Sequence, residues 1–209
     1  MTDTSSASSR LAQCGVVPVV TIEKVAHAVP LANALLAGGI NSIEITLRTP
    51  SAMECIAEIV SANTGISVGV GTVTNTEQID TIAKIGADFI VTPATPAALV
   101  PALKEYDGLV LPGTATPTEA LSLYSQGFEI VKFFPAEAAG GVPMLKALSG
   151  PLPEIKFMPT GGINPQNVKT YLDLPNVVAA GGSWITPKAH LDSENWDAIT
   201  ALATGARPD

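Results

Sequence analysis

Eight short apolar runs recur along the chain, each beginning roughly 20–27 residues after the one before it, which is the length of one strand, one helix and two loops. The segments between the runs carry apolar residues at helical spacing, as at Ala52, Ile56 and Ile59. This alternation predicts repeated strand–helix units. The runs are Val16–Ile22, Ser42–Leu47, Ser67–Thr72, Phe89–Thr92, Leu109–Leu111, Ile130–Phe134, Lys156–Pro159 and Val177–Ala180.

The predicted strands are mostly apolar on both faces, as is typical of parallel strands covered by helices. Eight units within 209 residues match a compact (β/α)8 TIM barrel, because eight is a number of strands at which a sheet closes. The alternative is an open doubly wound sheet, but no Gly-x-Gly-x-x-Gly follows the first run. We therefore expect an α/β fold with a single barrel domain over 14–209, preceded by a flexible tail over 1–13 that is rich in Ser and Thr.

Helix starts are marked by Thr or Asn followed by proline, a pattern typical of an N-cap with proline in the first helical position. The pairs are Thr49-Pro50, Thr95-Pro96, Thr116-Pro117 and Asn164-Pro165. Gly38-Gly39 predicts a left-handed cap at the end of an earlier helix.

Charge and residue counts exclude other classes of function. The chain has a net charge of −8 and only 11 basic residues, which leaves little for a face that binds nucleic acid. No apolar run approaches the roughly 18 residues of a membrane span. Cys14, Cys55, His27 and His190 are too few and too scattered for a disulfide framework or a metal site. We expect a cytoplasmic protein with no metal, membrane or nucleic-acid partner.

The carboxyl ends of the predicted strands combine glycine or proline with hydroxyl residues. In a barrel, this end carries the ligand site, and the loops after the seventh and eighth strands commonly bind phosphate. Thr160-Gly161-Gly162 and Gly181-Gly182-Ser183 occupy these two positions. Glycines let backbone N–H groups approach an anion, so the pair of loops predicts a phosphate site, although a single Gly-Gly could also just turn the chain.

The second run places polar residues on one face. Glu44, Thr46 and Arg48 alternate with apolar residues and should point into the barrel. Buried charges need partners, so these residues predict either a ligand site or a structural Glu44–Arg48 ion pair. Arg48 is the one arginine of the chain outside the two terminal segments, and arginine suits a carboxylate or phosphate.

Lys132 lies in the middle of the sixth apolar run. Lysine is rarely buried, and burial favours the neutral amine, which can attack a carbonyl carbon to give an imine. The pattern predicts a nucleophilic Lys132. The alternative is a lysine that reaches solvent or pairs with Glu44.

Taken together, these segments resemble the family of 2-keto-3-deoxy-6-phosphogluconate (KDPG) aldolases, which also act on 4-hydroxy-2-oxoglutarate (KHG). The resemblance extends from Val16 to Trp184. It implies a metal-independent and cofactor-free class I aldolase on a (β/α)8 barrel, forming a homotrimer, with a 2-keto-3-deoxy sugar-acid phosphate and pyruvate as its small-molecule partners. The segments are Glu44–Thr49, Gly71–Val73, Lys132–Glu137, Pro159–Ile163 and Gly181–Trp184.

The resemblance also implies a role for each matching residue. Lys132 would form a Schiff base with the C2 carbonyl, and Glu44 would be the general acid and base. The residues that would bind or enclose the keto-acid end are Arg48, Thr72, Pro93, Phe134 and Thr160. Those that would bind the distal phosphate are Gly161, Gly162, Gly182 and Ser183.

One departure from the family pattern is Ala94, where relatives usually have glycine after the proline, and it puts the local shape of the pocket in question. The Thr160-Gly161-Gly162 segment favours the gluconate over the galactonate type. Two alternatives stay open, because a fold alone does not choose a chemistry. One is a phospho-sugar isomerase or decarboxylase that uses carboxylates without a covalent lysine. The other is a non-catalytic barrel that binds phospho-ligands.

Overall fold

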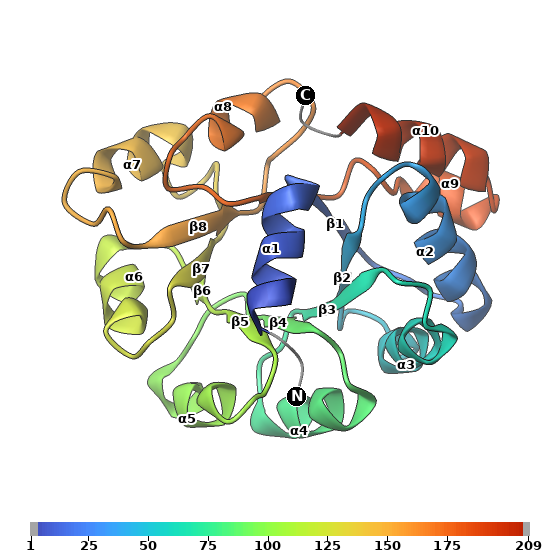
Figure 1. The fold of residues 1–209 in the computed structure, drawn as a ribbon, viewed down its shortest axis with the longest axis horizontal. Helices are drawn as coiled ribbons and strands as arrows, with labels where there is room; N and C mark the ends of the chain where they lie inside the picture. The colour runs from blue at the N-terminus through green and yellow to red at the C-terminus, as the bar shows by residue number, and fades with distance from the viewer. Residues whose placement is uncertain (1–3, 207–209) are drawn as a thin grey trace.

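The computed structural model describes residues 4–206, and its paired strands are all parallel. Figure 1 shows the strands around the centre of the molecule, with most of the helices outside them. The strands are β1 (Val16–Val20), β2 (Ser42–Thr46), β3 (Ser67–Gly71), β4 (Phe89–Val91), β5 (Leu109–Leu111), β6 (Gly113–Thr114), β7 (Ile130–Phe133), β8 (Lys156–Pro159) and β9 (Ala180–Gly182).

The strands are divided between two sheets. One has the order β5-β4-β3-β2-β1-β9, and the other has the order β6-β7-β8. At one boundary β5 continues into β6 through Pro112, which has no N–H to donate to a ladder. At the other boundary, isolated parallel bridges join Phe157 to Val177 and Thr160 to Gly181. The α/β class and the parallel strand order predicted from the apolar runs are confirmed.

Helices follow most of the strands, as the periodicity predicts. They are α1 (Thr4–Cys14), α2 (Ala28–Ala37), α3 (Ala52–Ala62), α4 (Thr76–Ile85), α5 (Val100–Lys104), α6 (Pro117–Tyr124), α7 (Gly141–Leu148), α8 (Val168–Leu172), α9 (Lys188–Asp192) and α10 (Trp196–Ala206), with 3₁₀ turns η1 (Val25–His27) and η2 (Ala97–Leu99). Within residues 4–206, no helix has the length and apolar character needed to cross a membrane.

The last strand begins later than predicted. The apolar run Val177–Ala180 suggested its position, but β9 covers Ala180–Gly182. Its register with β1 pairs Ala180 with Val16 and Gly182 with Pro18. Pairing with the buried first strand therefore overrides the low strand propensity of glycine.

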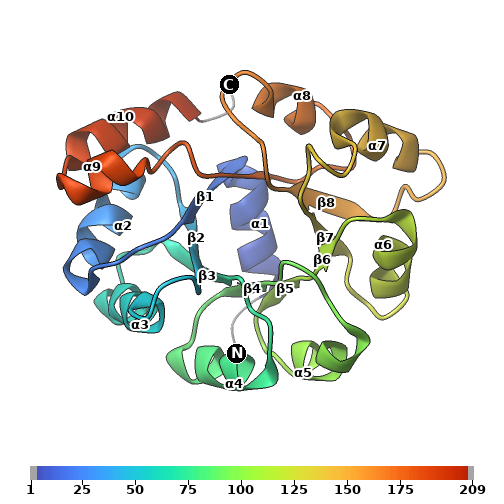
Figure 2. The ribbon, with the colours of Figure 1, turned by 180° about the vertical axis from the view of Figure 1, so that it is seen from behind.

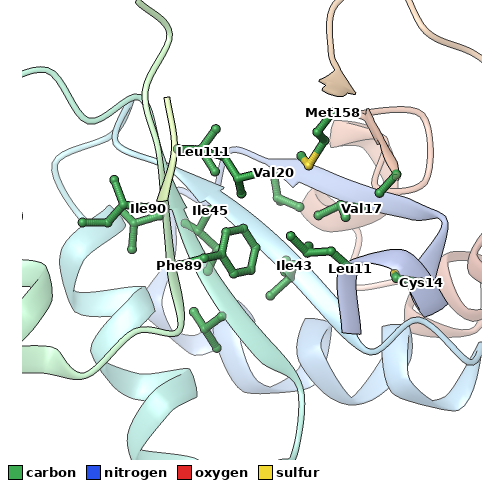
Figure 3. Close-up of a cluster of buried hydrophobic side chains, with 14 of the residues drawn as sticks. Leu11, Cys14, Val17, Val20, Ile43, Ile45, Phe89, Ile90, Leu111 and Met158 are labelled. Atoms are coloured by element: carbon green, nitrogen blue, oxygen red, sulfur yellow. The ribbon is translucent and has the colours of Figure 1, made fainter. Parts of the chain in front are cut away.

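The prediction of a flexible tail over 1–13 is wrong for residues 4–13, which belong to α1; residues 1–3 lie outside the described part of the chain. Ala7 and Leu11 are four residues apart, so they share one face of this helix, and both are buried. Figure 3 draws Leu11 in one buried cluster with Val17 and Ile43. Burial of this apolar face explains why a Ser/Thr-rich segment is ordered as a helix.

Helix α1 lies at the amino ends of the strands. Arg10 Nη1 donates a hydrogen bond to the carbonyl of Gly65, just before β3, at 3.0 Å. Figure 1 shows α1 in front of the strands, and Figure 2 shows it behind them. The carboxyl ends of the strands therefore lie on the opposite side of the molecule from α1.

One of the four predicted Thr/Asn-Pro helix starts is confirmed. Thr116 caps α6 in a complete capping box with Glu119, and Pro117 follows in the first turn. The other three pairs precede turns instead, because α3, α5 and α8 begin two to five residues after them. Gly39 has a φ of 82° just after α2, which confirms the left-handed cap.

The capping box predicts a pH-dependent stability. Hydrogen bonds from the N–H groups of Ala115 and Thr116, chiefly the one from Ala115, lower the pKa of Glu119. A lowered pKa in the folded state stabilises the fold above the unfolded pKa of about 4.3, and this contribution is lost as the pH falls through the folded pKa. We expect Glu119→Gln to lower the free energy of unfolding by about 0.5 kcal/mol at pH 7 and by progressively less below pH ~4.3. Urea unfolding of the wild type and of Glu119→Gln, at pH 7 and below pH ~4.3, measures the change in the free energy of unfolding. An equal change under the two conditions would contradict the assignment.

Candidate active site

A cavity of about 470 Å³ opens at the carboxyl ends of the strands, the end that faces away from α1. Its lining comes from residues of β1 and β9 and from the segments that follow β1, β2, β7, β8 and β9, so residues far apart in sequence meet there. The residues that line it are Val19, Thr21, Glu23, Arg48, Phe134, Thr160, Gly161, Gly162, Ile163, Gly181, Ser183, Thr186, Pro187, Lys188 and Leu191.

Lys132 and Glu44 form a buried pair in the interior. Lys132 Nζ donates to Glu44 Oε1 at 3.2 Å, and the two side chains are 5% and 0% exposed. Lys132 belongs to β7, in the three-stranded sheet, and Glu44 belongs to β2, in the six-stranded sheet. The contact therefore links the two sheets.

The strands leave room for this pair through their glycines. A Cβ on Gly71 of β3 would lie 2.1 Å from Glu44 Oε1, so the Glu44 carboxylate occupies the space that any larger residue would fill. Gly113 of β6 is the register partner of Lys132. The backbone of Pro93 packs against Gly113, with its carbonyl carbon 2.5 Å from where a Cβ would stand. Gly71 therefore leaves space for the Glu44 side chain, and Gly113 lets the backbone of the segment after β4 approach the strand beside Lys132.

The pairing of Lys132 with Glu44 was the structural alternative to a nucleophilic lysine, and the structure shows that this pair exists. A buried ion pair serves stability only when its remaining hydrogen-bonding groups are satisfied. Glu44 Oε2 is buried without a hydrogen-bond partner among the described residues. Such an oxygen calls for an explanation, and a ligand that donates a hydrogen bond to it would provide one. The alternative Glu44–Arg48 pair is not formed.

Phe134 connects the buried pair to the open cavity. Lys132 Nζ lies 5.2 Å from the centroid of the Phe134 ring, and Phe134 also lines the cavity. Thr160, at the end of β8, is buried and lines the same cavity, and its Oγ1 has no hydrogen-bond partner among the described residues. A Cβ on Gly181 would lie 2.3 Å from this oxygen, so the Thr160 side chain fills the space that a larger residue at position 181 would need.

Arg48 differs from its predicted position. The alternation from Glu44 placed it inside the barrel, but β2 ends at Thr46 and Arg48 is exposed. The strand ends because the Arg48 N–H turns back to the carbonyl of Thr46, at 2.8 Å. Arg48 lines the cavity beside Phe134 and Thr160 rather than the dry interior. A guanidinium in this position can meet an anion that enters from solvent.

Parts of both glycine loops line the same cavity: Gly161, Gly162, Gly181 and Ser183. Gly161 and Gly162 follow β8 with φ values of 102° and 81°, a region that favours glycine. A Cβ on Gly162 would lie 2.5 Å from Cγ of Glu137, whose carboxylate accepts a hydrogen bond from the Tyr171 hydroxyl. Burial and the contact with Glu137 raise the pKa of Tyr171, so it stays protonated as the donor. Ser183 follows β9 on the neighbouring wall.

Besides the buried pair of Lys132 and Glu44, three predicted site residues do not line the cavity within the described chain: Thr72, Pro93 and Gly182. Thr72 adopts a φ of 64° and directly follows Gly71, the glycine that leaves space for the Glu44 carboxylate. Gly182 lies in β9 against the Trp184 ring, since a Cβ on Gly182 would lie 1.9 Å from Cζ3 of that ring.

The sequence interpretation missed four polar residues that line the cavity. They are Thr21, Glu23, Thr186 and Lys188. Thr21 Oγ1 hydrogen-bonds Thr46 Oγ1 at 3.0 Å, and Thr186 is buried with no partner for its hydroxyl oxygen among the described residues. The available signal was their position, because each follows a strand end by one to six residues.

Comparisons with known proteins cover nearly the whole chain. Residues 7–202 match the family model described as KDPG and KHG aldolase. The chain is 44% identical to the 2-dehydro-3-deoxy-phosphogluconate aldolase of Pseudoalteromonas atlantica, across 96% of this chain and 94% of that protein. It is 42% identical to the KHG/KDPG aldolase of Escherichia coli strain K12, across 97% and 95%.

A solved structure provides the same comparison in three dimensions. The KDPG aldolase of Legionella pneumophila superposes with a TM-score of 0.93 and 40% identity, covering 96% of this chain and 98% of that one. That structure holds pyruvate captured at low pH as a covalent carbinolamine intermediate.

Proposed function

The chain belongs to the KDPG and KHG aldolase family, and from this membership we propose that it cleaves 2-keto-3-deoxy-6-phosphogluconate to pyruvate and glyceraldehyde 3-phosphate as a class I, Schiff-base aldolase. The observation that carries the proposal is the buried Lys132–Glu44 pair beside Phe134, with one carboxylate oxygen unpartnered. The double name of the Escherichia coli relative supports a second substrate, 4-hydroxy-2-oxoglutarate, which would give pyruvate and glyoxylate.

Lys132 would start the reaction. Its amine attacks the C2 carbonyl carbon, and loss of water from the carbinolamine gives a protonated imine. Glu44 Oε1, 3.2 Å from Nζ, is placed to accept the proton that the attacking amine must release. Burial of both groups keeps bulk water away from the imine.

Glu44 would then move the protons of the cleavage step. A base removes the proton of the C4 hydroxyl, the C3–C4 bond breaks, and its electron pair moves toward the imine nitrogen to give an enamine. The aldehyde product leaves, C3 takes up a proton, and water hydrolyses the imine to release pyruvate and the free Lys132 amine. General acid–base catalysis of this kind contributes about 10²–10⁴-fold to the rate.

The ends of the substrate would be bound on different walls of the site. Arg48 and Thr72 would bind the carboxylate next to C2, with Pro93, Phe134 and Thr160 shaping that end. The distal phosphate would lie on Gly161, Gly162, Gly182 and Ser183. Binding energy from the remote phosphate would position C2 against Lys132.

Three further properties belong to this proposal. The two sheets would act as one closed (β/α)8 barrel in a single domain, a reading supported by the bridges from Phe157 to Val177 and from Thr160 to Gly181. The protein would be a homotrimer, and it would work in the cytoplasm.

Reductive trapping tests the proposal. We expect incubation with pyruvate and borohydride to add one pyruvate less one oxygen atom to the protein, because borohydride reduces the imine to a stable secondary amine. Peptide mapping should place the added mass on Lys132. As the control, Lys156, which is half-buried and donates to the carbonyl of Pro175 at 3.2 Å, should stay unmodified.

Two other results would favour the alternatives. Turnover of a phospho-sugar with no trapped adduct would support an isomerase or decarboxylase that uses carboxylates alone. Binding of phosphate esters without any turnover would support a non-catalytic barrel.

A further inference from the structure

A second cation lines the cavity on the wall that carries Ser183. Lys188 is the first residue of α9, and its Nζ lies 2.9 Å from Glu23 Oε1 and 3.1 Å from Asp192 Oδ1. Lys188 and Glu23 both line the cavity, and their side chains are 64% and 60% exposed. Glu23 comes from the segment after β1, so the pair joins two sides of the cavity rim.

Lys188 is one of the few charged residues that line the cavity, and the proposed reaction does not yet use it. Among the described residues that line the cavity, those charged at neutral pH are Arg48, Lys188 and Glu23. Arg48 is proposed for the carboxylate beside C2. The phosphate is a second anion of the substrate, and it would otherwise meet only backbone N–H groups and the Ser183 hydroxyl.

The hydrogen bonds of Lys188 leave one donor for a ligand. An ammonium group has three N–H donors, and the Glu23 and Asp192 carboxylates each accept one. The bonds to Glu23 and Asp192 also raise the pKa of Lys188, so it stays charged over the working pH range of a cytoplasmic enzyme. The two carboxylates hold the ammonium at the rim, which lowers the entropy lost when a phosphate binds it.

We propose that Lys188 binds the distal phosphate of the substrate through its remaining N–H donor, and that Glu23 opposes this binding through its negative charge. The inference rests on the proposed function, because it names a further residue for the same site. It makes Lys188 a determinant of the preference for phosphorylated over unphosphorylated sugar acids. The attraction is exposed to solvent, so it weakens as salt is added.

Two substitutions at one ion pair separate this role from a structural one. Lys188→Met and Glu23→Gln both remove the Glu23–Lys188 ion pair, so a purely structural pair predicts that both change activity in the same direction. A phosphate-binding Lys188 predicts opposite directions, because one substitution removes the attracting charge and the other removes the repelling charge. Lys169→Met is the matched control, since Lys169 also forms an exposed ion pair, with Asp173 at 3.0 Å, but does not line this cavity.

The measurement is kcat/KM for 2-keto-3-deoxy-6-phosphogluconate divided by kcat/KM for the same acid without its phosphate. We expect Lys188→Met to lower this ratio about fivefold to tenfold and Glu23→Gln to raise it about twofold at low ionic strength. Lys169→Met should leave the ratio unchanged. Both effects should shrink as the salt concentration rises.

The results that would overturn the inference are distinct from failure of the proposed function. An unchanged ratio in Lys188→Met, or a change of the same sign in Lys188→Met and Glu23→Gln, rejects phosphate binding by Lys188 while leaving the aldolase intact. If the wild-type protein releases no pyruvate from either acid, the proposed function itself fails.

Discussion

Replacement of Lys132 by methionine should abolish turnover, with kcat/KM falling by about 10⁴-fold or more. Methionine fills nearly the same volume but has no nitrogen to bond to C2, so neither the imine nor the enamine can form. Cleavage is measured by the pyruvate released, and covalent binding by borohydride trapping. Lys132→Met should give no adduct.

The fold of this variant needs its own control, because the substitution leaves the buried Glu44 carboxylate without its cation. Breaking a buried ion pair in this way costs about 3–5 kcal/mol of stability. The double variant Lys132→Met/Glu44→Gln removes both charges and should regain part of this loss. Near-normal activity in a folded Lys132→Met protein would exclude Lys132 as the nucleophile.

Replacement of Glu44 by glutamine should slow cleavage by about 10²–10³-fold while leaving imine formation less affected. Glutamine keeps the shape of the side chain and can still accept a hydrogen bond from Lys132, but it cannot take up and return a proton. The same loss should appear in the exchange of the pyruvate methyl protons, because that exchange uses proton transfer at C3 without cleavage of a C–C bond.

Exchange is followed by NMR of pyruvate in heavy water, alongside the yield of the trapped adduct. We expect a trapped adduct in Glu44→Gln together with slow exchange. Exchange at the wild-type rate would show that another group moves the proton at C3, and would leave Glu44 as a partner of Lys132 alone.

The two candidate catalytic residues, Lys132 and Glu44, stand out in the sequence because their surroundings are unusual. Lys132 stands inside an apolar run, and Glu44 shares a strand face with Thr46 in a chain with few charged residues. A lysine or glutamate in such a place must be buried, and burial of a charge without a purpose is costly. The structure confirms that both residues are buried.

The predictions that failed depended on where elements end. Arg48 follows the alternation of Glu44 and Thr46, yet the strand stops before it and the arginine reaches solvent. The tail over 4–13 looked polar, yet Ala7 and Leu11 give α1 a buried face. Such boundaries are set by contacts with distant segments, which local propensity does not contain.

The sequence by itself determined the repeating strand–helix order, the α/β class and the unusual placement of Lys132 and Glu44, because periodicity and a charge within an apolar run are local properties of the chain. Only the tertiary structure decided which groups meet: Glu44 pairs with Lys132 rather than Arg48, Gly71 leaves the space for that pair, and Glu23 reaches Lys188 across 165 positions of the chain. The physical reason is that these contacts depend on strand register and on the space between side chains, and both are fixed only when the whole chain packs at once.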